Sequence, residues 1–285
     1  MKTLAVLPLL GTLARLRGFV SGLPPSPRMP VLFLGHGSPM NAIEENDFVR
    51  GFREVAATLP RPRAIVCVSA HWETRGTRVT AMPQPRTIHD FRGFPPELYR
   101  VQYPAPGDAG LAAEVRGLAR KTLIEDDHAW GLDHGAWSVL RHLFPLADIP
   151  VVQLSLNTQL DPVGHLALAA ELQTLRDRGV LIVGSGNIVH NLGLMAWDKL
   201  NVDGFAYDWA AEARSTINEL ILKGDASSLA TIRSRGKAFS LAIPTPEHYL
   251  PLLYIMGLRT PQDDVRLFND AHLGGSLTMT SVVVG

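Results

Sequence analysis

The sequence predicts an α/β fold, a single-domain sandwich in which helices flank a mostly parallel central sheet. Two observations support this prediction. Short apolar runs recur along the chain, and most of them lack the strict apolar–polar alternation of a strand with one wet face. Between the runs lie segments whose apolar residues recur at helical spacing. Strands that alternate with helices are typical of parallel sheets covered on both faces.

Five apolar runs predict the strands of this sheet. The first four have no strict alternation, so we expect them to be buried on both faces. The fifth lies at the end of the chain and is rich in valine and threonine, which favour strands. The predicted strands cover residues 31–35, 64–70, 150–156, 180–184 and 277–284.

Three segments between these runs predict helices. The first, 108–121, begins at Asp108, a good N-cap residue. The second, 163–178, follows a proline suited to a first helical turn, and Gly179 ends it. The third covers about 205–222 and precedes a stretch, 223–237, that we expect to be a polar loop. A further segment, 83–107, is rich in proline, glycine and aromatic residues, and long loops of this kind often cover active sites.

The composition limits the classes of partner. Apolar residues make up 46% of the 285 residues and charged residues 19%, so the chain can bury a sizeable core. Basic and acidic residues are equal at 27 each, which argues against a nucleic-acid or anionic-membrane partner. The single cysteine, Cys67, excludes an intrachain disulfide and a cysteine-rich zinc module, and we expect it to be a small buried residue. The composition gives no oligomeric state.

The first 28 residues are set apart from the rest. They contain an apolar stretch that loosely resembles a signal peptide, but Arg15 and Arg17 interrupt it and a proline-rich linker follows. The stretch is also too short to span a membrane. We expect residues 1–28 to be a non-catalytic extension, disordered or upstream of a natural start at Met29, and residues 29–285 to form the catalytic domain. The expected location is the cytoplasm, with export through the N-terminal segment as the alternative.

Histidines gather at one predicted edge of the sheet. His36, His71 and His190 each follow a predicted strand, and ligands of open α/β sheets bind beyond the carboxyl ends of the strands. His134 and His248 each lie near the start of a predicted helix. A single histidine at a strand end is often only a polar residue that meets solvent. Three at matching positions, flanked by glycines, predict a shared site.

Imidazole groups in this arrangement predict metal chemistry. Neutral imidazole binds zinc and non-haem iron, and three protein ligands with open positions make a catalytic site. A further histidine outside the ligand set could act as a base. The other histidines lack this context, so we expect His89 to border the pocket and the rest to be surface or core residues; these are His128, His142, His165 and His272.

Other catalytic and nucleotide-binding motifs are absent from the sequence. No nucleophile elbow of the Gly-x-Ser-x-Gly type occurs in a suitable context, and "GSGN" at 184–187 is only superficially similar. That run could also form a phosphate-binding glycine loop. The chain has no G-x-G-x-x-G motif and no Walker lysine, so nucleotide binding is not expected.

Six motifs in order resemble the 4,5-DOPA extradiol dioxygenases. This group belongs to the class III extradiol ring-cleavage dioxygenases, to which the catalytic subunit of protocatechuate 4,5-dioxygenase is distantly related. The resemblance covers roughly residues 29–285. The motifs are FLGHGSPMNAIEEN, VSAHWETRGTRVTA, TIHDFRGFPPELYRVQYPAPG, WGLDHGAWSVL, GSGNIVHNL and PTPEHYLPLLYIMG.

The resemblance implies a reaction and a set of ligands. The reaction inserts both atoms of O₂ into a catechol ring beside its hydroxyl groups, with 4,5-cleavage when the substrate is L-DOPA. His36 and His71 match two metal ligands of the family. The third ligand is His248 or, as in the more distant relatives, Glu247. Iron(II) is the expected metal for activity, and zinc(II) could be the bound metal instead.

Two further histidines have roles implied by the resemblance. His190 matches a base-like histidine that is also counted among the metal-site residues of close relatives. His134 matches a histidine that supports the site or contacts substrate. Aromatic side chains such as Trp72, Trp137 and Tyr249 could line the ring pocket or simply pack in the core.

Two alternatives stay open at this point. The first is a zinc-dependent hydrolase on a similar scaffold, because zinc in an all-histidine site could activate water. The second is a non-catalytic protein that binds a metal or a small ligand at the same site. If the protein is an extradiol dioxygenase, its natural substrate could be L-DOPA or another substituted catechol.

Overall fold

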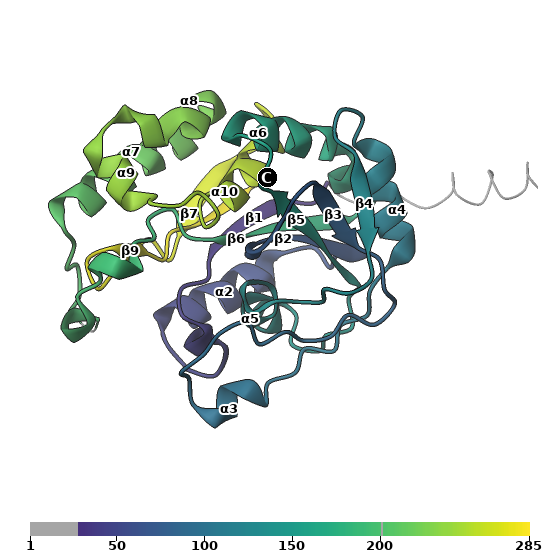
Figure 1. Cartoon of the computed structure of the whole chain (residues 1–285), viewed down its shortest axis with the longest axis horizontal. Coiled ribbons are helices and arrows are strands. Elements are labelled where there is room, and N and C mark those ends of the chain that lie inside the picture. The colour runs from purple at the N-terminus through teal and green to yellow at the C-terminus, as the bar shows by residue number, and fades with distance from the viewer. Residues whose placement is uncertain (1–27, 201) are drawn as a thin grey trace, which may run out of the picture.

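A mostly parallel sheet forms the centre of the computed structural model, which describes residues 28–200 and 202–285 (Figure 1). The predicted extension lies outside the described residues except for Arg28. Within the described part, eight strands form one sheet in the order β4-β3-β5-β2-β6-β1-β10-β7, and β8 and β9 form a small hairpin beside it. The strands are β1 (Val31–Gly35), β2 (Ala64–Thr74), β3 (Thr77–Thr80), β4 (Ile124–Asp127), β5 (Val151–Asn157), β6 (Val180–Gly186), β7 (Val265–Phe268), β8 (His272–Leu273), β9 (Leu277–Thr278) and β10 (Ser281–Val284).

The four central strands β5, β2, β6 and β1 are parallel to one another, as the sequence predicts. Antiparallel strands extend the sheet on either side, because β3 pairs with β5 and β10 pairs with β1 in that sense. The carboxyl ends of β1, β2 and β6 therefore lie side by side at one edge. The α/β prediction is confirmed, and this edge is where a ligand is expected to bind.

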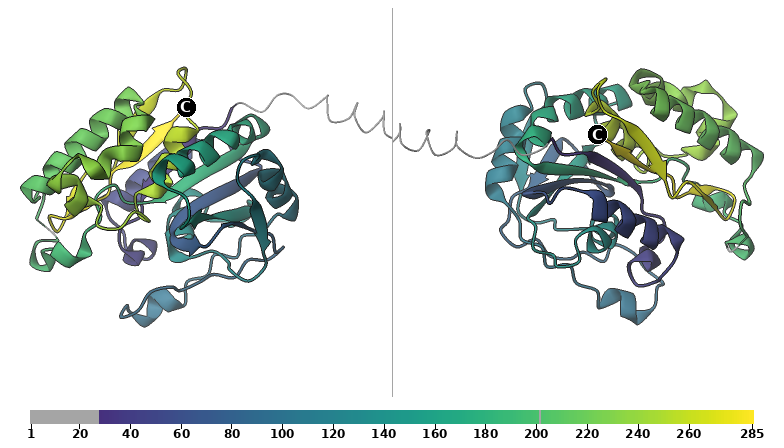
Figure 2. Two further views of the ribbon diagram at one scale, coloured as in Figure 1. Left: turned by 45° about the horizontal axis from the view of Figure 1, so that its top comes forward. Right: turned by 180° about the vertical axis from the view of Figure 1, so that it is seen from behind.

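Helices cover both faces of the sheet, as Figures 1 and 2 show. On one face lie α2 and α5; on the other lie α6 and α10, with α7, α8 and α9 packed beside them. The α-helices are α2 (Asp47–Thr58), α3 (Pro96–Tyr99), α4 (Ala109–Leu118), α5 (His134–Leu143), α6 (Pro162–Glu171), α7 (Asp208–Lys223), α8 (Ala226–Thr231), α9 (Lys237–Ala242) and α10 (Leu250–Gly257). Short 3₁₀ helices are η1 (Pro39–Ala42), η2 (Gln173–Arg178), η3 (Leu192–Leu194), η4 (Trp197–Lys199) and η5 (Ile232–Arg235).

Most predicted elements are present, and three differ. The expected helix 163–178 changes to the 3₁₀ helix η2 after residue 171, and the expected polar loop 223–237 contains α8 and η5. The expected strand 277–284 is divided between β9 and β10. The chain leaves the strand path there because the amide of Thr278 donates to the carbonyl of Val189 and that of Met279 to Ala271.

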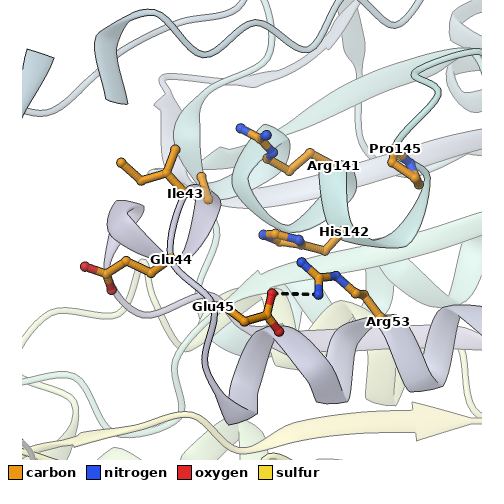
Figure 3. A pocket seen from close by; sticks show the side chains of 8 residues that line it. Ile43, Glu44, Glu45, Arg53, Arg141, His142 and Pro145 are labelled. Carbon is orange, nitrogen blue, oxygen red and sulfur yellow. Dashed lines mark hydrogen bonds and ion pairs between the residues drawn. The ribbon is translucent and has the colours of Figure 1, made fainter. Parts of the chain in front are cut away.

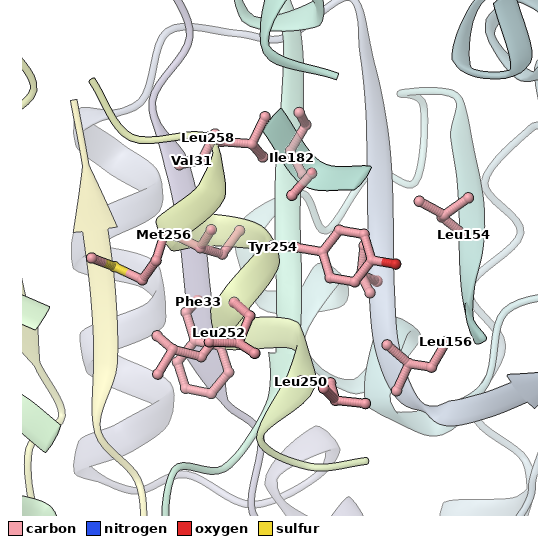
Figure 4. Close-up of a cluster of buried hydrophobic side chains, with 14 of the residues drawn as sticks. Val31, Phe33, Leu154, Leu156, Ile182, Leu250, Leu252, Tyr254, Met256 and Leu258 are labelled. Atoms are coloured by element: carbon pink, nitrogen blue, oxygen red, sulfur yellow. The ribbon is translucent and has the colours of Figure 1, made fainter. Parts of the chain in front are cut away.

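Alternate side chains of each central strand enter two separate cores. Val31 and Phe33 of β1 pack with α10 on one face, whereas Leu32 and Leu34 pack with α2 and α5 on the other. Figure 4 shows the first of these cores, where Tyr254 lies over the strands. Residues 250–256 of α10 are all buried. Each large apolar side chain so buried contributes about 1.5–3 kcal/mol, which fixes the start of α10 against the sheet.

Two local details concern the predicted strand ends. β2 continues to Thr74, so His71 lies within the strand and not after it as predicted; the pairing with β5 is irregular between Val68 and Glu73. "GSGN" is the end of β6 and not a phosphate loop. Gly184 and Gly186 lie there under the chain that enters α10. In the described part of the chain, no helix has the length and apolar character needed to cross a membrane.

Candidate active site

A cavity of about 340 Å³ lies at the carboxyl ends of β1, β2 and β6. Five imidazole rings line it, and the other walls are largely apolar. The lining residues are His36, Gly37, Ser38, Pro39, His71, Phe91, Phe94, His134, His190, Leu192, Met195, Trp197, Leu200, His248, Leu273 and Leu277. All five histidines that the sequence analysis selected therefore share one cavity.

β1 presents His36 to this cavity. Its backbone amide donates to the carbonyl of Gly186, and Gly37 turns the chain with a φ of 61° that favours glycine. The ring Nδ1 lies 3.1 Å from Oγ of Ser185, whose hydroxyl donates to the carbonyl of Gly135. The hydroxyl must then accept from Nδ1, so Nδ1 of His36 carries the hydrogen. Its Nε2 is left with a free lone pair directed away from Ser185.

His71 faces His36 across the cavity. The two Nε2 atoms are 3.2 Å apart, and Nδ1 of His71 lies 3.5 Å from Oδ2 of Asp90. Gly135 leaves room for this ring, because a Cβ at that position would lie 2.8 Å from His71 Cδ2. Ser185 and Asp90 therefore lie against the two rings, and a larger residue than glycine at position 135 would push the His71 ring out of its place.

His248 completes a group of three. One ring nitrogen each from His36, His71 and His248 lies within 4.8 Å of the other two. Nδ1 of His248 lies 3.0 Å from Oε1 of Glu247, so that the carboxylate accepts the Nδ1 hydrogen and Nε2 stays free. Glu247 is not part of this group of three.

The three rings fit a metal ion. Burial, helped by the neighbouring imidazoles, lowers the pKa of His36 and of His71 well below the usual value, so both rings are neutral. Two nitrogen ligands of a tetrahedral ion lie about 3.3 Å apart when each bond is about 2.0 Å long. The separation of 3.2 Å between the two Nε2 atoms is close to this value. Neutral imidazole suits zinc, iron, copper and nickel.

His190 lies on the other side of His248. The two rings stack with centroids 3.5 Å apart and planes 7° from parallel. Burial, with His248 beside it, lowers the pKa of His190 to about 3, so its ring is neutral at rest. Its ring nitrogen shares a separate group with Glu247 and His248 and does not join His36 and His71. The ring is thus placed beside the three-histidine group and open to the cavity.

Asp90 is a site residue that the sequence analysis did not select. It lies in the long segment 83–107, and its Oδ2 is 2.9 Å from Nδ1 of His134, while the amide of His134 donates to Oδ1. Burial raises the pKa of Asp90, but the bonds from His134 outweigh it, and the net shift is downward. The carboxylate is therefore ionised and orients both His134 and His71. The only signal in the sequence was its place within this long segment.

The three aromatic residues that could line the ring pocket or pack in the core do the latter. Trp72 stacks on Trp130, Trp137 is fully buried and donates to the carbonyl of Ile88, and Tyr249 donates to the carbonyl of Leu229. None of the three lines the cavity, so their role is packing. Phe91 and Phe94, from the long segment, supply the aromatic wall instead.

The remaining histidines lie outside the cavity. His89 does not line it but packs behind Phe91, with ring centroids 5.8 Å apart. His165 is buried against Tyr254, and His128 is exposed.

His142 belongs to a second hollow of about 490 Å³ (Figure 3). This hollow is larger than the histidine cavity. Two of its charged side chains, Arg53 and Glu45, form an ion pair at 2.7 Å and so neutralise each other. Its one imidazole, His142, bonds to the carbonyl of Asn41. It therefore offers no group of ligands comparable to that of the histidine cavity.

Comparison of the sequence with known proteins identifies the family of this chain. Residues 28–239 match the family "Catalytic LigB subunit of aromatic ring-opening dioxygenase". The chain belongs to this family, and with it to the aromatic ring-opening dioxygenases.

Individual relatives define the class more closely. A protein of Escherichia coli K12 named 4,5-DOPA dioxygenase extradiol is 46% identical over 91% of this chain and 96% of its own. A protein of the same name from Beta vulgaris is 36% identical over 87% and 94%. A crystal structure of an uncharacterized Escherichia coli K12 protein matches with a TM-score of 0.76 and 40% identity, covering 90% of this chain and all of that one. The chain is an extradiol ring-cleavage dioxygenase.

Proposed function

We propose that the enzyme cleaves a substituted catechol beside its paired hydroxyl groups, with iron(II) bound by His36, His71 and His248. The substrate we propose is L-DOPA or a related catechol, because the similar proteins of known name carry DOPA in that name. The observation that carries the proposal is the group of three imidazole nitrogens within 4.8 Å at the floor of an apolar cavity.

The proposed ligand set favours His248 over Glu247. The Glu247 carboxylate accepts from Nδ1 of His248 and from Thr245, so it is engaged behind the ring and not beside the other two imidazoles. A carboxylate in this position fixes the ring and strengthens its free nitrogen as a ligand. When bound, iron(II) would hold the catechol oxygens and O₂ side by side and allow electrons to pass from the ring to oxygen.

His190 is the proposed base. Its neutral ring opens to the cavity beside His248, where it can accept a proton from a catechol hydroxyl and return it when the ring opens. His134 is proposed to contact the substrate, since its ring lines the cavity and Asp90 accepts from its backbone amide. Phe91 and Phe94 would bound the substrate ring and keep water away from it.

An oxygen-uptake experiment tests the proposal. The purified chain is loaded with iron(II) without air, mixed with a catechol, and given O₂. We expect O₂ consumption in step with a yellow ring-opened product. The same chain loaded with zinc(II) should bind the catechol without consuming O₂. A protein that binds metal and catechols but turns over none of them in the iron form would contradict the proposal and favour the non-catalytic alternative.

A zinc-dependent hydrolase on this scaffold is not supported, because the family match is to ring-opening dioxygenases. Zinc in a purified sample would not change this conclusion, since zinc binds imidazole sites more tightly than iron(II) does.

A further inference from the structure

We propose that Asn41 is a positioning residue of the metal site, which holds His36 where its Nε2 can bind the ion together with the other two proposed ligands. This inference rests on the proposed function and adds to it a residue that does not line the cavity. It is carried by the hydrogen bonds that end on the turn after β1.

The amide and the carbonyl of His36 are held by different parts of the molecule. β1 ends at Gly35, and the amide of His36 then donates to the carbonyl of Gly186 in the sheet. The chain turns away from the strand at Gly37, whose φ is 61°. The buried carbonyl of His36 accepts from Nδ2 of Asn41 at 2.9 Å. Because a buried carbonyl without a donor is costly, this bond fixes the second peptide group of the proposed ligand.

Asn41 is itself fixed on every side. Its Oδ1 accepts from Nδ2 of Asn46 at 2.8 Å, its amide donates to the carbonyl of Ser38, and its carbonyl accepts from Nε2 of His142 at 2.8 Å. A backbone carbonyl only accepts, so Nδ2 of Asn41 must face His36 and its Oδ1 must face Asn46. The side-chain amide therefore cannot turn over without losing both of these bonds.

These bonds connect the proposed ligand to two helices. Asn46 is the N-cap residue of α2. His142 lies in the last turn of α5, and the first residue of that helix, His134, lines the cavity. Asn41 lies in η1 and is bonded to both helices. The position of His36 is therefore set by α2 and α5 as well as by the sheet.

A shift of this turn would disturb the metal site directly. Site residues must be held within about 0.5 Å of their productive geometry, and Nε2 of His36 lies only 3.2 Å from Nε2 of His71. Residues 37–39 of the same turn line the cavity. A Cβ on Gly37 would lie 3.1 Å from Nδ2 of Asn41, so the turn packs closely on this amide. Without Asn41, both the ring and this part of the cavity wall should move.

Zinc affinity measured without turnover tests the inference. Asn41→Leu keeps a similar side-chain volume but removes the donor to His36 and the acceptor for Asn46. We expect its Kd for zinc, measured by competition with a chelator, to rise about 10–100-fold, the usual effect of losing a partner behind a metal ligand. The visible spectrum of bound cobalt(II), which depends on the ligand geometry, should change as well. A zinc Kd equal to that of the wild type would overturn the inference.

Asn157→Leu is the matched control. Asn157 is as buried as Asn41, each being 6% exposed. Its partners lie outside the cavity; they are Gly76, Thr77 and Gln159. Asn157→Leu should unfold at a lower urea concentration than the wild type, as Asn41→Leu does, but should keep the wild-type zinc affinity and cobalt(II) spectrum. An equal loss of zinc affinity in both variants would show that Asn41 acts only through general stability, and would overturn the inference.

Asn46→Asp gives a second test that preserves the helix cap and does not depend on the folding of Asn41→Leu. Aspartate caps a helix as well as asparagine does, but it has no amide to donate to Oδ1 of Asn41. Its carboxylate would repel that oxygen and displace the Asn41 side chain from His36. We expect the zinc Kd to rise, although a nearby negative charge by itself favours a cation. Unchanged or tighter zinc binding would overturn the inference.

The wild type and His36→Ala separate this inference from the proposed function. If the iron-loaded wild type cleaves no catechol while the zinc results are as expected, the proposed function fails and the inference stands. If His36→Ala binds zinc as tightly as the wild type does, His36 is not a ligand and both proposals are wrong. If His36→Ala loses zinc affinity but the Asn41 and Asn46 variants keep it, the inference alone is wrong.

Discussion

At the scale of single residues, hydrogen bonds fix which nitrogen of each imidazole faces the cavity. Ser185 accepts from Nδ1 of His36, and Glu247 accepts from Nδ1 of His248, so both Nε2 atoms keep their lone pairs. Asp90 lies beside His134, with Oδ2 2.9 Å from its Nδ1 and Oδ1 accepting from its backbone amide. The site is thus prepared by residues that need not touch the substrate or the metal.

The proposed base can be separated from the proposed ligands. His190 stacks on His248 but does not share the group of three nitrogens, so His190→Ala should keep metal binding and lower kcat about 10²–10⁴-fold. Metal content is measured by atomic emission and turnover by O₂ uptake. His128→Ala, at an exposed position, is the control. Retained turnover in His190→Ala would rule out the base role.

The choice between His248 and Glu247 as third ligand is also measurable. If Glu247 only orients the ring, Glu247→Gln should weaken metal affinity about 10–100-fold, because the amide oxygen is a poorer acceptor for Nδ1–H. His248→Ala should lose far more, since it removes a ligand. Competition with a chelator gives both affinities. Equal and complete loss in the two variants would point to Glu247 as a direct ligand.

At the scale of elements, the close approach of α10 to β6 brings His248 to the cavity. A Cβ on Gly186 would lie 2.1 Å from the carbonyl oxygen of His248, whose acceptor bond from Asn187 ties the two segments together. Gly184 lies under Pro251 in the same way. Glycines at the end of β6 therefore serve the packing of the next element.

This packing gives a prediction for glycine variants. Gly186→Ala should push the start of α10 from the sheet, lower metal affinity at least ten-fold and destabilise the fold. Gly117→Ala is a matched control, because that glycine lies in α4 with no atom within 4 Å of the added methyl. It should leave metal binding unchanged and be neutral or stabilise by about 0.5–1 kcal/mol. Metal titration and urea unfolding compare the two, and unchanged metal affinity in Gly186→Ala would refute the packing role.

The strands and the positions of His36 and His190 could be predicted because a parallel sheet brings the carboxyl ends of its strands together. Such periodic patterns are local and can be read from the chain. Asp90 and the segment 192–200 could not be predicted in this way. Their places depend on contacts made across the fold by irregular backbone, and no period in the sequence marks them. For the same reason, the sequence does not distinguish a pocket position from a core position for Trp137.

At the scale of the whole molecule, one buried ion pair joins the start of the domain to its far end. Arg176 of η2 is fully buried and donates to the carbonyls of Met29 and Leu258, while two nitrogens of its guanidinium bond to both oxygens of Asp263 at 2.7 and 2.8 Å. These segments precede β1, follow α10 and precede β7. The pair therefore connects both cores at the edge of the sheet opposite the active site.

This ion pair makes the free energy of unfolding depend on pH in the acid range. Burial raises the pKa of Asp263, but the bonds from Arg176 and Thr260 outweigh it and hold the pKa at about 2, below the usual 3.8. Between these values the unfolded chain binds the proton and the folded chain does not, so stability rises with pH there. About 2 kcal/mol should be present above about pH 4 and lost as the pH falls to about 2.

The variant Asp263→Asn isolates this contribution. It leaves a buried guanidinium without its counter-charge, so it should lower the free energy of unfolding by about 3–5 kcal/mol at neutral pH. The deficit against the wild type should shrink by about 2 kcal/mol as the pH falls from about 4 to about 2, because the wild-type carboxylate is then protonated as well. Asp177→Asn, which breaks the exposed pair with Arg28, should cost about 0–1 kcal/mol at any pH. Urea unfolding across this range gives all three curves, and a deficit for Asp263→Asn that stays constant with pH would show that Asp263 has no depressed pKa in the folded chain.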